Sequence, residues 1–90
     1  MAWKILNTWT DSGMTGNAAE LTAEKDGQTV YVSVGTTEFG YHYVVSSRDL
    51  FVGDASDSII AEYSTQREAL ASPYGPVFRK AVEAFRKIGS

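Results

Sequence analysis

Apolar and polar residues alternate through residues 18–46, a period typical of strands that bury one face of a sheet. Asp26-Gly27 divides this stretch and favours a two-residue type I′ turn, because both central positions of that turn need positive φ. Pairing Lys25 with Gln28 around the turn separates the flanking side chains into an apolar row and a polar row. The apolar row contains the pairs Ala23–Val30, Leu21–Val32 and Ala19–Val34. The polar row contains the pairs Glu24–Thr29, Thr22–Tyr31 and Glu20–Ser33. Because a one-residue slip would exchange the two rows, the pattern predicts this register.

A third antiparallel strand is expected after the second, across an even-length loop formed by residues 35–40. This loop pairs Val34 with Tyr41 and continues the apolar row. The further apolar pairs are Val32–Tyr43 and Val30–Val45. On the polar row, His42 is expected beside Ser33. The region about 18–46 is therefore predicted to be a three-stranded meander with one buried and one solvated face.

Shorter strands are expected on either side of the meander. Residues 3–9 alternate and predict an N-terminal strand, and the polar and glycine-containing residues 10–17 predict a loop after it. Residues 50–52 and 59–63 are short β-like runs, separated by a turn at 53–57. Counting these runs, the sheet should contain four to six strands.

The hydrophobic period changes to 3.6 residues in the last quarter of the chain. Thr65 and Glu68 fit a capping box that opens a short helix. Pro73 should interrupt this helix, because the residue before a proline avoids the α region. A second helix is expected over about 76–88, with an apolar stripe along one side. The stripe comprises Val77, Phe78, Ala81, Val82, Phe85 and Ile88.

The opposite side of the second helix is charged, and i,i+4 ion pairs are expected between Arg79 and Glu83 and between Glu83 and Lys87. The apolar stripe matches the apolar row of the meander, so the helix should lie across that row. The expected floor is Leu21, Val32, Val34, Tyr41 and Tyr43. The prediction is an α+β fold: an antiparallel sheet of four to six strands with one C-terminal amphipathic helix packed on one face, in a single domain over residues 1–90.

Composition narrows the class of protein without naming a function. Ninety residues with 43% hydrophobic and 21% charged side chains are typical of one small globular domain. The absence of cysteine excludes disulfides, thiolate metal sites and cysteine nucleophiles. The start of the chain lacks the pattern of a signal peptide and no apolar run is long enough to span a membrane, so a cytoplasmic protein without membrane contact is expected.

Charge is distributed unevenly within a net charge of −3. Residues 1–62 contain three basic and nine acidic side chains, a balance of −6, whereas residues 63–90 contain five basic and two acidic ones, a balance of +3. Most of the chain would therefore repel a phosphate backbone. A nucleic-acid interface is expected only on the basic side of the C-terminal helix, at Arg79, Lys80, Arg86 and Lys87.

His42 is the only histidine, and its expected place beside Ser33, with Glu20 on the next strand, resembles the row of a nucleophile and its base. An open sheet face supplies neither a pocket nor oxyanion donors, so no catalytic residue is predicted and the row is kept as an alternative ligand site. One histidine without cysteine cannot build a structural zinc site. The glycine-containing turns have no phosphate-loop spacing, so no metal and no cofactor are predicted.

Aromatic residues outside the expected core indicate an interface with another protein, where such residues are enriched. Tyr31 and Phe39 are expected on the solvated side of the meander, and one of the two tryptophans is expected outside the core as well. Tyr74 lies in a rigid turn between two prolines that would present its ring outward. The alternative for Tyr74 is that its ring fastens the turn onto the core.

Part of the chain resembles HicB-like antitoxin domains. The residues that carry the resemblance are a strand ending in Asp49-Leu50, Gly53, and a helix opening as Thr65-x-x-Glu68-Ala69-Leu70, all within residues 39–70. The spacing between Gly53 and Thr65 is longer than in that family, and Pro73 shortens the helix. The resemblance implies a protein-binding, toxin-neutralising role.

These observations favour a small non-catalytic protein-interaction module, such as an inhibitor, an antitoxin-like protein or an accessory protein. Its partner should be another protein, and the chain itself should be a monomer or a weak homodimer. Two alternatives remain open: a nucleic-acid-binding protein that uses the basic helix, and a small-ligand binder or enzyme centred on His42.

Overall fold

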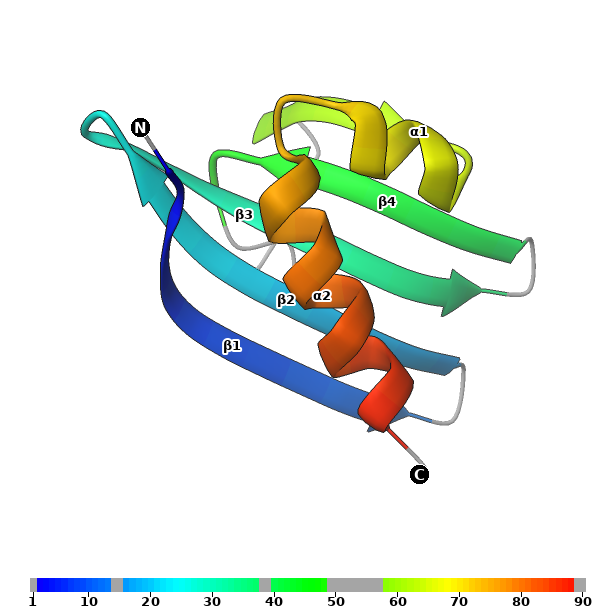
Figure 1. Ribbon diagram of the computed structural model, residues 1–90. Coiled ribbons are helices and arrows are strands. Elements are labelled where there is room, and N and C mark those ends of the chain that lie inside the picture. The colour runs from blue at the N-terminus through cyan, green and yellow to red at the C-terminus, as the bar shows by residue number, and fades with distance from the viewer. Residues whose placement is uncertain (1, 14–15, 38–39, 49–57, 89–90) are drawn as a thin grey trace.

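The computed structural model describes residues 2–13, 16–37, 40–48 and 58–88 (Figure 1). Within them the chain forms five strands and two helices. The strands are β1 (Lys4–Gly13), β2 (Gly16–Lys25), β3 (Gln28–Thr37), β4 (Gly40–Ser46) and β5 (Ile59–Tyr63), and the helices are α1 (Gln66–Ala71) and α2 (Gly75–Lys87). The predicted runs at 50–52 and 53–57 lie outside the described residues.

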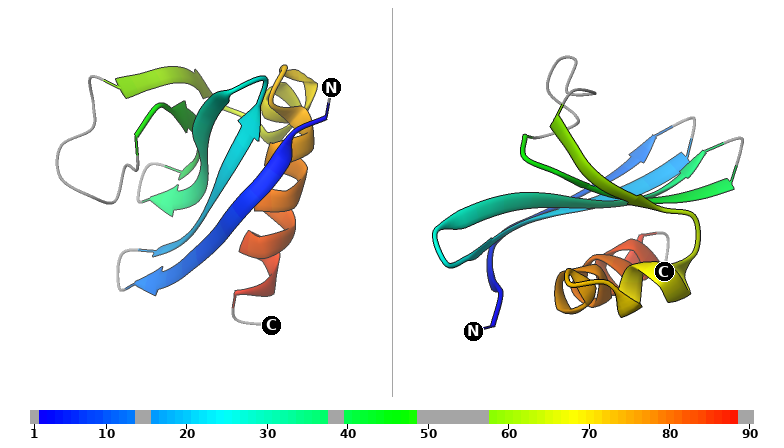
Figure 2. Two further views of the ribbon diagram at one scale, coloured as in Figure 1. Left: turned by 90° about the vertical axis from the view of Figure 1, so that its left-hand side faces the viewer. Right: turned by 90° about the horizontal axis from the view of Figure 1, so that it is seen from above.

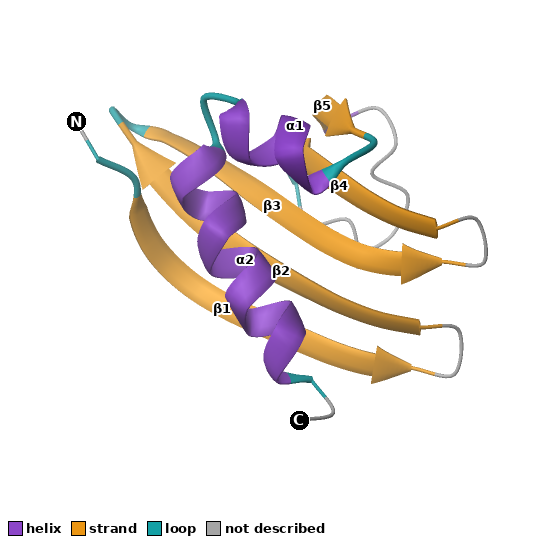
Figure 3. Ribbon diagram, turned by 45° about the vertical axis from the view of Figure 1, so that its right-hand side comes forward, coloured by secondary structure: helices purple, strands orange, loops and turns teal. Residues whose placement is uncertain are grey.

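The strands form one antiparallel sheet in the order β1-β2-β3-β4-β5, so each strand pairs with its neighbour in sequence (Figure 3). Helix α2 crosses this sheet diagonally and contacts β2 and β3 most, and β1 less. Figure 2 shows both helices on the same side of the sheet. We call this side the helix face and the other side the open face. The predicted α+β fold is confirmed.

The hairpin between β2 and β3 has the predicted register at every position. Lys25 pairs with Gln28, and the ladder continues outward without a shift to the pair Ala18–Gly35. Asp26 and Gly27 both have positive φ, 54° and 81°, as the tight turn requires. The apolar row is fully buried on the helix face.

Two sequence-based predictions about the strands were wrong. Residues 10–13 and 16–17, which were assigned to a loop, belong to strands: β1 continues to Gly13 and β2 begins at Gly16. Pairing with the neighbouring strand therefore outweighs the weak strand preference of these polar residues. The register between β3 and β4 differs from the prediction by two residues, because β3 continues to Thr37 and leaves only residues 38–39 between the strands. A shift of two keeps each side chain on its predicted face but changes its partner, so His42 lies opposite Gly35 and not beside Ser33.

A bulge in β1 also breaks the alternation expected over residues 3–9. Ile5 pairs with Ala23 and Asn7 with Thr22, which leaves Leu6 as an extra residue. The side chains before and after the bulge are therefore out of phase. Ile5 shares the helix face with Ala23, whereas Trp9 pairs with Glu20 on the open face.

The core lies between α2 and the apolar row of the sheet. Phe78 is its fully buried aromatic residue, and its ring meets Tyr43 and Tyr63 edge-on at centroid distances of 6.2 and 5.8 Å. Phe85, which the helical stripe also assigned to the core, is only partly buried against it. The side chain of Tyr41 lies outside the described residues.

Helix α1 begins as the capping box predicts, because the Thr65 hydroxyl accepts a hydrogen bond of 3.2 Å from the Glu68 backbone N–H. Helix α2 has Pro76 within its first turn, where a missing N–H costs no hydrogen bond. Within α2, Lys80 and Glu83 form an ion pair at 4.0 Å, with a spacing of i,i+3 where i,i+4 pairs of Glu83 were expected.

Candidate functional site

The outer side of β1 is a long strand edge. Among the described residues β1 pairs only with β2, so the backbone groups on its other side are available to a further strand. Its ten residues have charges only at Lys4 and Asp11. Between these charges Ile5, Leu6 and Trp9 are 36%, 46% and 42% exposed.

Natural edge strands are usually short or interrupted by charged residues, which prevent pairing with other chains. The opposite edge, β5, has only five residues and includes Glu62. The uncharged segment of β1 from Ile5 to Thr10 lacks that protection, apart from the bulge at Leu6. The length and composition of β1 therefore distinguish it as the candidate binding edge.

A groove runs between β1 and the C-terminal half of α2 on the helix face. Its volume is about 700 Å³. Apolar side chains contributed by β1, β2 and the end of α2 form part of its lining: Ile5, Leu21, Ala84 and Ile88. The other residues along the groove are polar or charged: Thr8, Thr10, Asp11, Ser12, Lys80, Glu83 and Lys87. A strand added to β1 would direct alternate side chains toward this groove.

The open face contains buried polar groups that the sequence pattern placed in solvent. Glu20 is 4% and Ser33 1% exposed, and the Ser33 hydroxyl donates a hydrogen bond of 3.4 Å to Glu20 Oε2. Ser46 is also buried and donates through its hydroxyl to the backbone carbonyl of Arg48 at 2.6 Å. Alternation assigned Glu20 and Ser33 to this face correctly, but it carries no information on what covers the face.

His42 is half-buried on the open face, across from Gly35. Burial lowers the pKa of the imidazole below 6.5, and the nearby Glu62 carboxylate opposes this effect by raising the pKa. The structure thus brings Glu20 and Ser33 together as expected, and places His42 two residue pairs farther along the sheet, opposite Gly35. The Ser33 hydroxyl donates its hydrogen bond to Glu20 and not to His42. In this arrangement His42 therefore does not act as a base toward Ser33.

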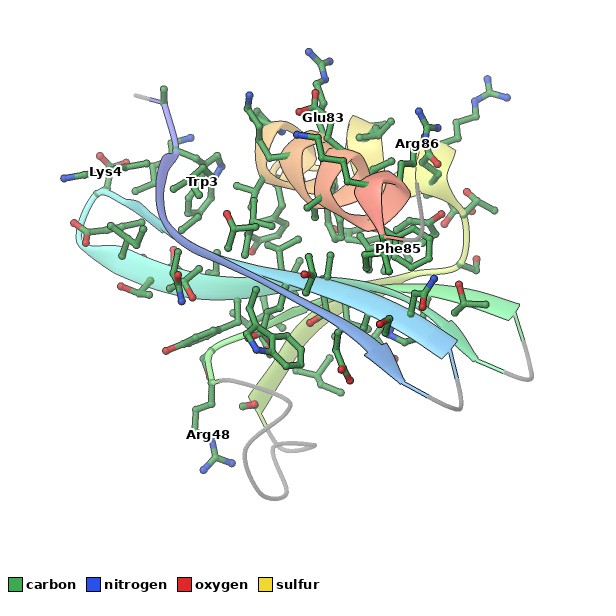
Figure 4. All side chains as sticks on the ribbon, turned by 90° about the horizontal axis from the view of Figure 1, so that it is seen from below. Trp3, Lys4, Arg48, Glu83, Phe85 and Arg86 are labelled. Atoms are coloured by element: carbon green, nitrogen blue, oxygen red, sulfur yellow. The ribbon has the colours of Figure 1, made fainter. Side chains whose placement is uncertain are left out.

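The predicted basic residues of α2 are all exposed: Arg79, Lys80, Arg86 and Lys87. In Figure 4 Glu83 and Arg86 lie on the outer side of the helix, whereas Phe85 points toward the sheet. Lys80 is engaged with Glu83, which lowers the positive charge of this surface.

The three predicted interface aromatics have different environments. Tyr31 is half-buried on the open face, opposite Thr22. Phe39 lies outside the described residues. The ring of Tyr74 packs against Trp3 with a centroid distance of 5.7 Å and an angle of 37° between the planes. This contact agrees with the alternative that Tyr74 fastens its turn to the rest of the protein, and the interface role of Tyr74 stays a prediction.

Trp3 makes two further contacts in the same place. Its indole Nε1 donates a hydrogen bond of 3.1 Å to the carbonyl of Pro73. The Lys25 ammonium lies 5.5 Å from the centre of the indole ring, within the range of a cation–π contact. The N-terminal arm is thereby joined to the β2–β3 hairpin and to the turn before α2.

The described part of the chain contains no cluster of three histidine, cysteine, aspartate or glutamate side chains arranged to hold a metal ion. Neither helix in that part has the length and apolar character needed to cross a membrane. No protein-family model, no curated protein and no solved structure matches the chain. The resemblance to HicB-like domains rests on the quoted residues alone, of which Asp49, Leu50 and Gly53 lie outside the described residues.

The β1 edge is the candidate that sequence reasoning missed. The uncharged segment between Lys4 and Asp11 was visible in the sequence, but part of it was assigned to a loop. The bulge at Leu6, which places Trp9 on the open face, has no glycine or proline to mark it.

Proposed function

We propose that this protein is a non-catalytic protein-interaction module that binds an extended segment of a partner along β1. The observation that carries the proposal is the exposure of Ile5, Leu6 and Trp9 on a ten-residue strand edge. Strand addition gives affinity through backbone hydrogen bonds and specificity through alternate side chains.

The two faces of β1 offer different contacts to such a strand. On the open face, Trp9 provides a large amphipathic ring of the kind that dominates binding energy at interfaces. On the helix face, the groove beside α2 offers apolar and hydroxyl groups. A bound strand with apolar residues at alternate positions would cover both.

The experiment compares capture by matched variants. Tagged wild-type protein, the variant Leu6→Ala/Trp9→Ala and the control Ile60→Ala are used to capture proteins from a lysate with and without nuclease treatment. The captured proteins are quantified by mass spectrometry. Ile60 is a suitable control because it lies on the opposite edge and is 43% exposed. Circular dichroism establishes that each variant is folded.

We expect the wild type and Ile60→Ala to capture a partner in stoichiometric amount. The double variant should capture at least tenfold less of this partner. Equal capture by all three proteins would exclude β1 as the interface. Loss of all captured protein on nuclease treatment would instead favour the basic side of α2 and nucleic acid, whose binding should weaken steeply with salt.

A further inference from the structure

We infer that the β1 edge pairs with the β1 edge of a second copy of this chain, antiparallel and about a two-fold axis at Thr8. The inference rests on the proposed function, because it assigns the partner of the same edge. It is carried by the opposite charges at the two ends of β1, Lys4 and Asp11, with uncharged residues between them. An antiparallel arrangement brings opposite ends of two identical strands together, so each charge meets its complement.

The bulge at Leu6 decides which residues can meet. Opposite β2, the residues of β1 occupy consecutive positions in the order Lys4, Ile5, Asn7, Thr8 and onward, with Leu6 extruded. Counting these positions outward from Thr8 places Lys4 opposite the partner's Asp11, three positions on either side of the axis. Without the bulge, Lys4 and Asp11 would lie on different faces and could not pair.

In the remaining pairs of this register, the two opposed side chains also lie on the same face of the sheet. Ile5 meets the partner's Thr10 on the helix face, and Asn7 meets the partner's Trp9 on the open face. The exposed Leu6 lies next to this second pair. The symmetric arrangement therefore covers the exposed apolar residues of β1 on both copies and forms two Lys4–Asp11 pairs.

The rest of the molecule accommodates this pairing. Figure 2 shows that the arm before β1 bends out of the sheet toward the helices, where Trp3 is held. A two-fold axis perpendicular to the sheet keeps both α2 helices on the same side of one continuous sheet. The two grooves beside α2 then face each other across the axis.

The main competing register is centred on Trp9, where nine positions overlap in place of seven. It places Lys4 opposite the partner's Gly13 and Asp11 opposite the partner's Asn7, so both ion pairs are lost. The charges therefore select the axis at Thr8. This choice is tested directly by cross-linking.

The chain contains no cysteine, so single cysteines can report the register without background. Directly opposed residues of antiparallel strands have Cα separations of about 4.5–5.5 Å, which a disulfide can bridge. Under mild oxidation we expect Thr8→Cys to form a covalent dimer with itself. The matched control Thr10→Cys, which is exposed on the same face, should form one only when mixed with Ile5→Cys.

Charge exchange gives a second readout in solution, measured by sedimentation over a range of concentrations. Lys4→Asp and Asp11→Lys should each raise the dissociation constant of the dimer about tenfold, because two exposed pairs change from attraction to repulsion. A mixture of the two variants should form a heterodimer, since both pairs across its axis then join an acidic side chain to a basic one.

The outcomes separate this inference from the proposed function. Cross-linking of mixed Thr8→Cys and Thr10→Cys, with neither alone reacting, would overturn the Thr8 axis in favour of Trp9. A monomer at all concentrations, together with β1-dependent capture of another protein, would overturn the second copy as partner and leave the proposed function standing. A monomer without β1-dependent capture would overturn both.

Discussion

The imidazole of His42 lies directly over Gly35, so closely that a β-carbon on residue 35 would be 2.6 Å from Cε1 and 2.7 Å from Nε2 of the ring. The two residues face each other across β3 and β4. A side chain at residue 35 would therefore require the His42 ring to move.

We expect Gly35→Ala to displace the His42 ring toward solvent and to lower the free energy of unfolding by about 1–3 kcal/mol. The imidazole pKa should rise toward 6.5 as the ring becomes hydrated. Urea unfolding and an NMR titration of the imidazole measure the two effects. In the background His42→Ala the same substitution should cost much less, and an equal cost there would show that the ring is not the obstacle.

The pH dependence of stability follows from the lowered pKa of His42. Because the folded protein binds this proton less readily than the unfolded chain, stability contributed by neutral His42 is complete above pH 6.5 and decreases as the pH falls toward the folded pKa. Unfolding measured between about pH 5 and 7.5 should show this loss in the wild type and a smaller one in His42→Gln. The substitution Glu62→Gln should lower the His42 pKa further, since it removes the charge that raises it. An unchanged or higher pKa in that variant would contradict the assignment.

The two phenylalanines of α2 should differ in their contribution to stability. Phe78→Ala should cost about 3–5 kcal/mol, because a fully buried ring leaves a cavity between Tyr43 and Tyr63. Phe85→Ala should cost clearly less, because its ring is only partly buried. Denaturant unfolding of both variants under one condition gives the comparison. Equal losses would mean that the stripe of α2 is uniformly buried.

Trp3 is expected to stabilise the fold through its contacts with Tyr74, Pro73 and Lys25. Trp3→Ala should lower the free energy of unfolding by about 2–4 kcal/mol, since it removes aromatic packing together with a hydrogen bond. Trp3→Phe retains a ring but not the indole donor, so it should recover part of this loss. If both variants unfold like the wild type, the arm does not contribute to stability.

The register that the sequence predicted correctly was the one set by local chemistry. Asp26-Gly27 admits a single tight turn, and the apolar row then fixes every pair of β2 and β3. The β3–β4 register was wrong by two residues because the faces are the same for any even shift, so burial alone could not choose the loop length. The bulge at Leu6 was missed because it is visible only in the pairing of β1 with β2. No residue type near Leu6 indicates a bulge in the sequence.

The candidate site was less predictable than the fold. Glu20 and Ser33 were placed together correctly, but their burial depends on the packing of the whole open face. Tyr74 was assigned two possible roles, and the contact that supports its role in fastening the turn is made with Trp3, which is far away in sequence. The edge position of β1 is likewise a property of the whole sheet order.

The bond between Trp3 and Pro73 also bears on the order in which the molecule assembles. Strands β1 to β4 are joined in sequence by connections of two residues each, whereas this bond joins residues 70 positions apart. The entropy of loop closure opposes such a contact until the intervening chain is already compact. We therefore expect the arm to dock last during folding and to detach first during unfolding, which makes it the earliest region to lose amide protection in hydrogen exchange.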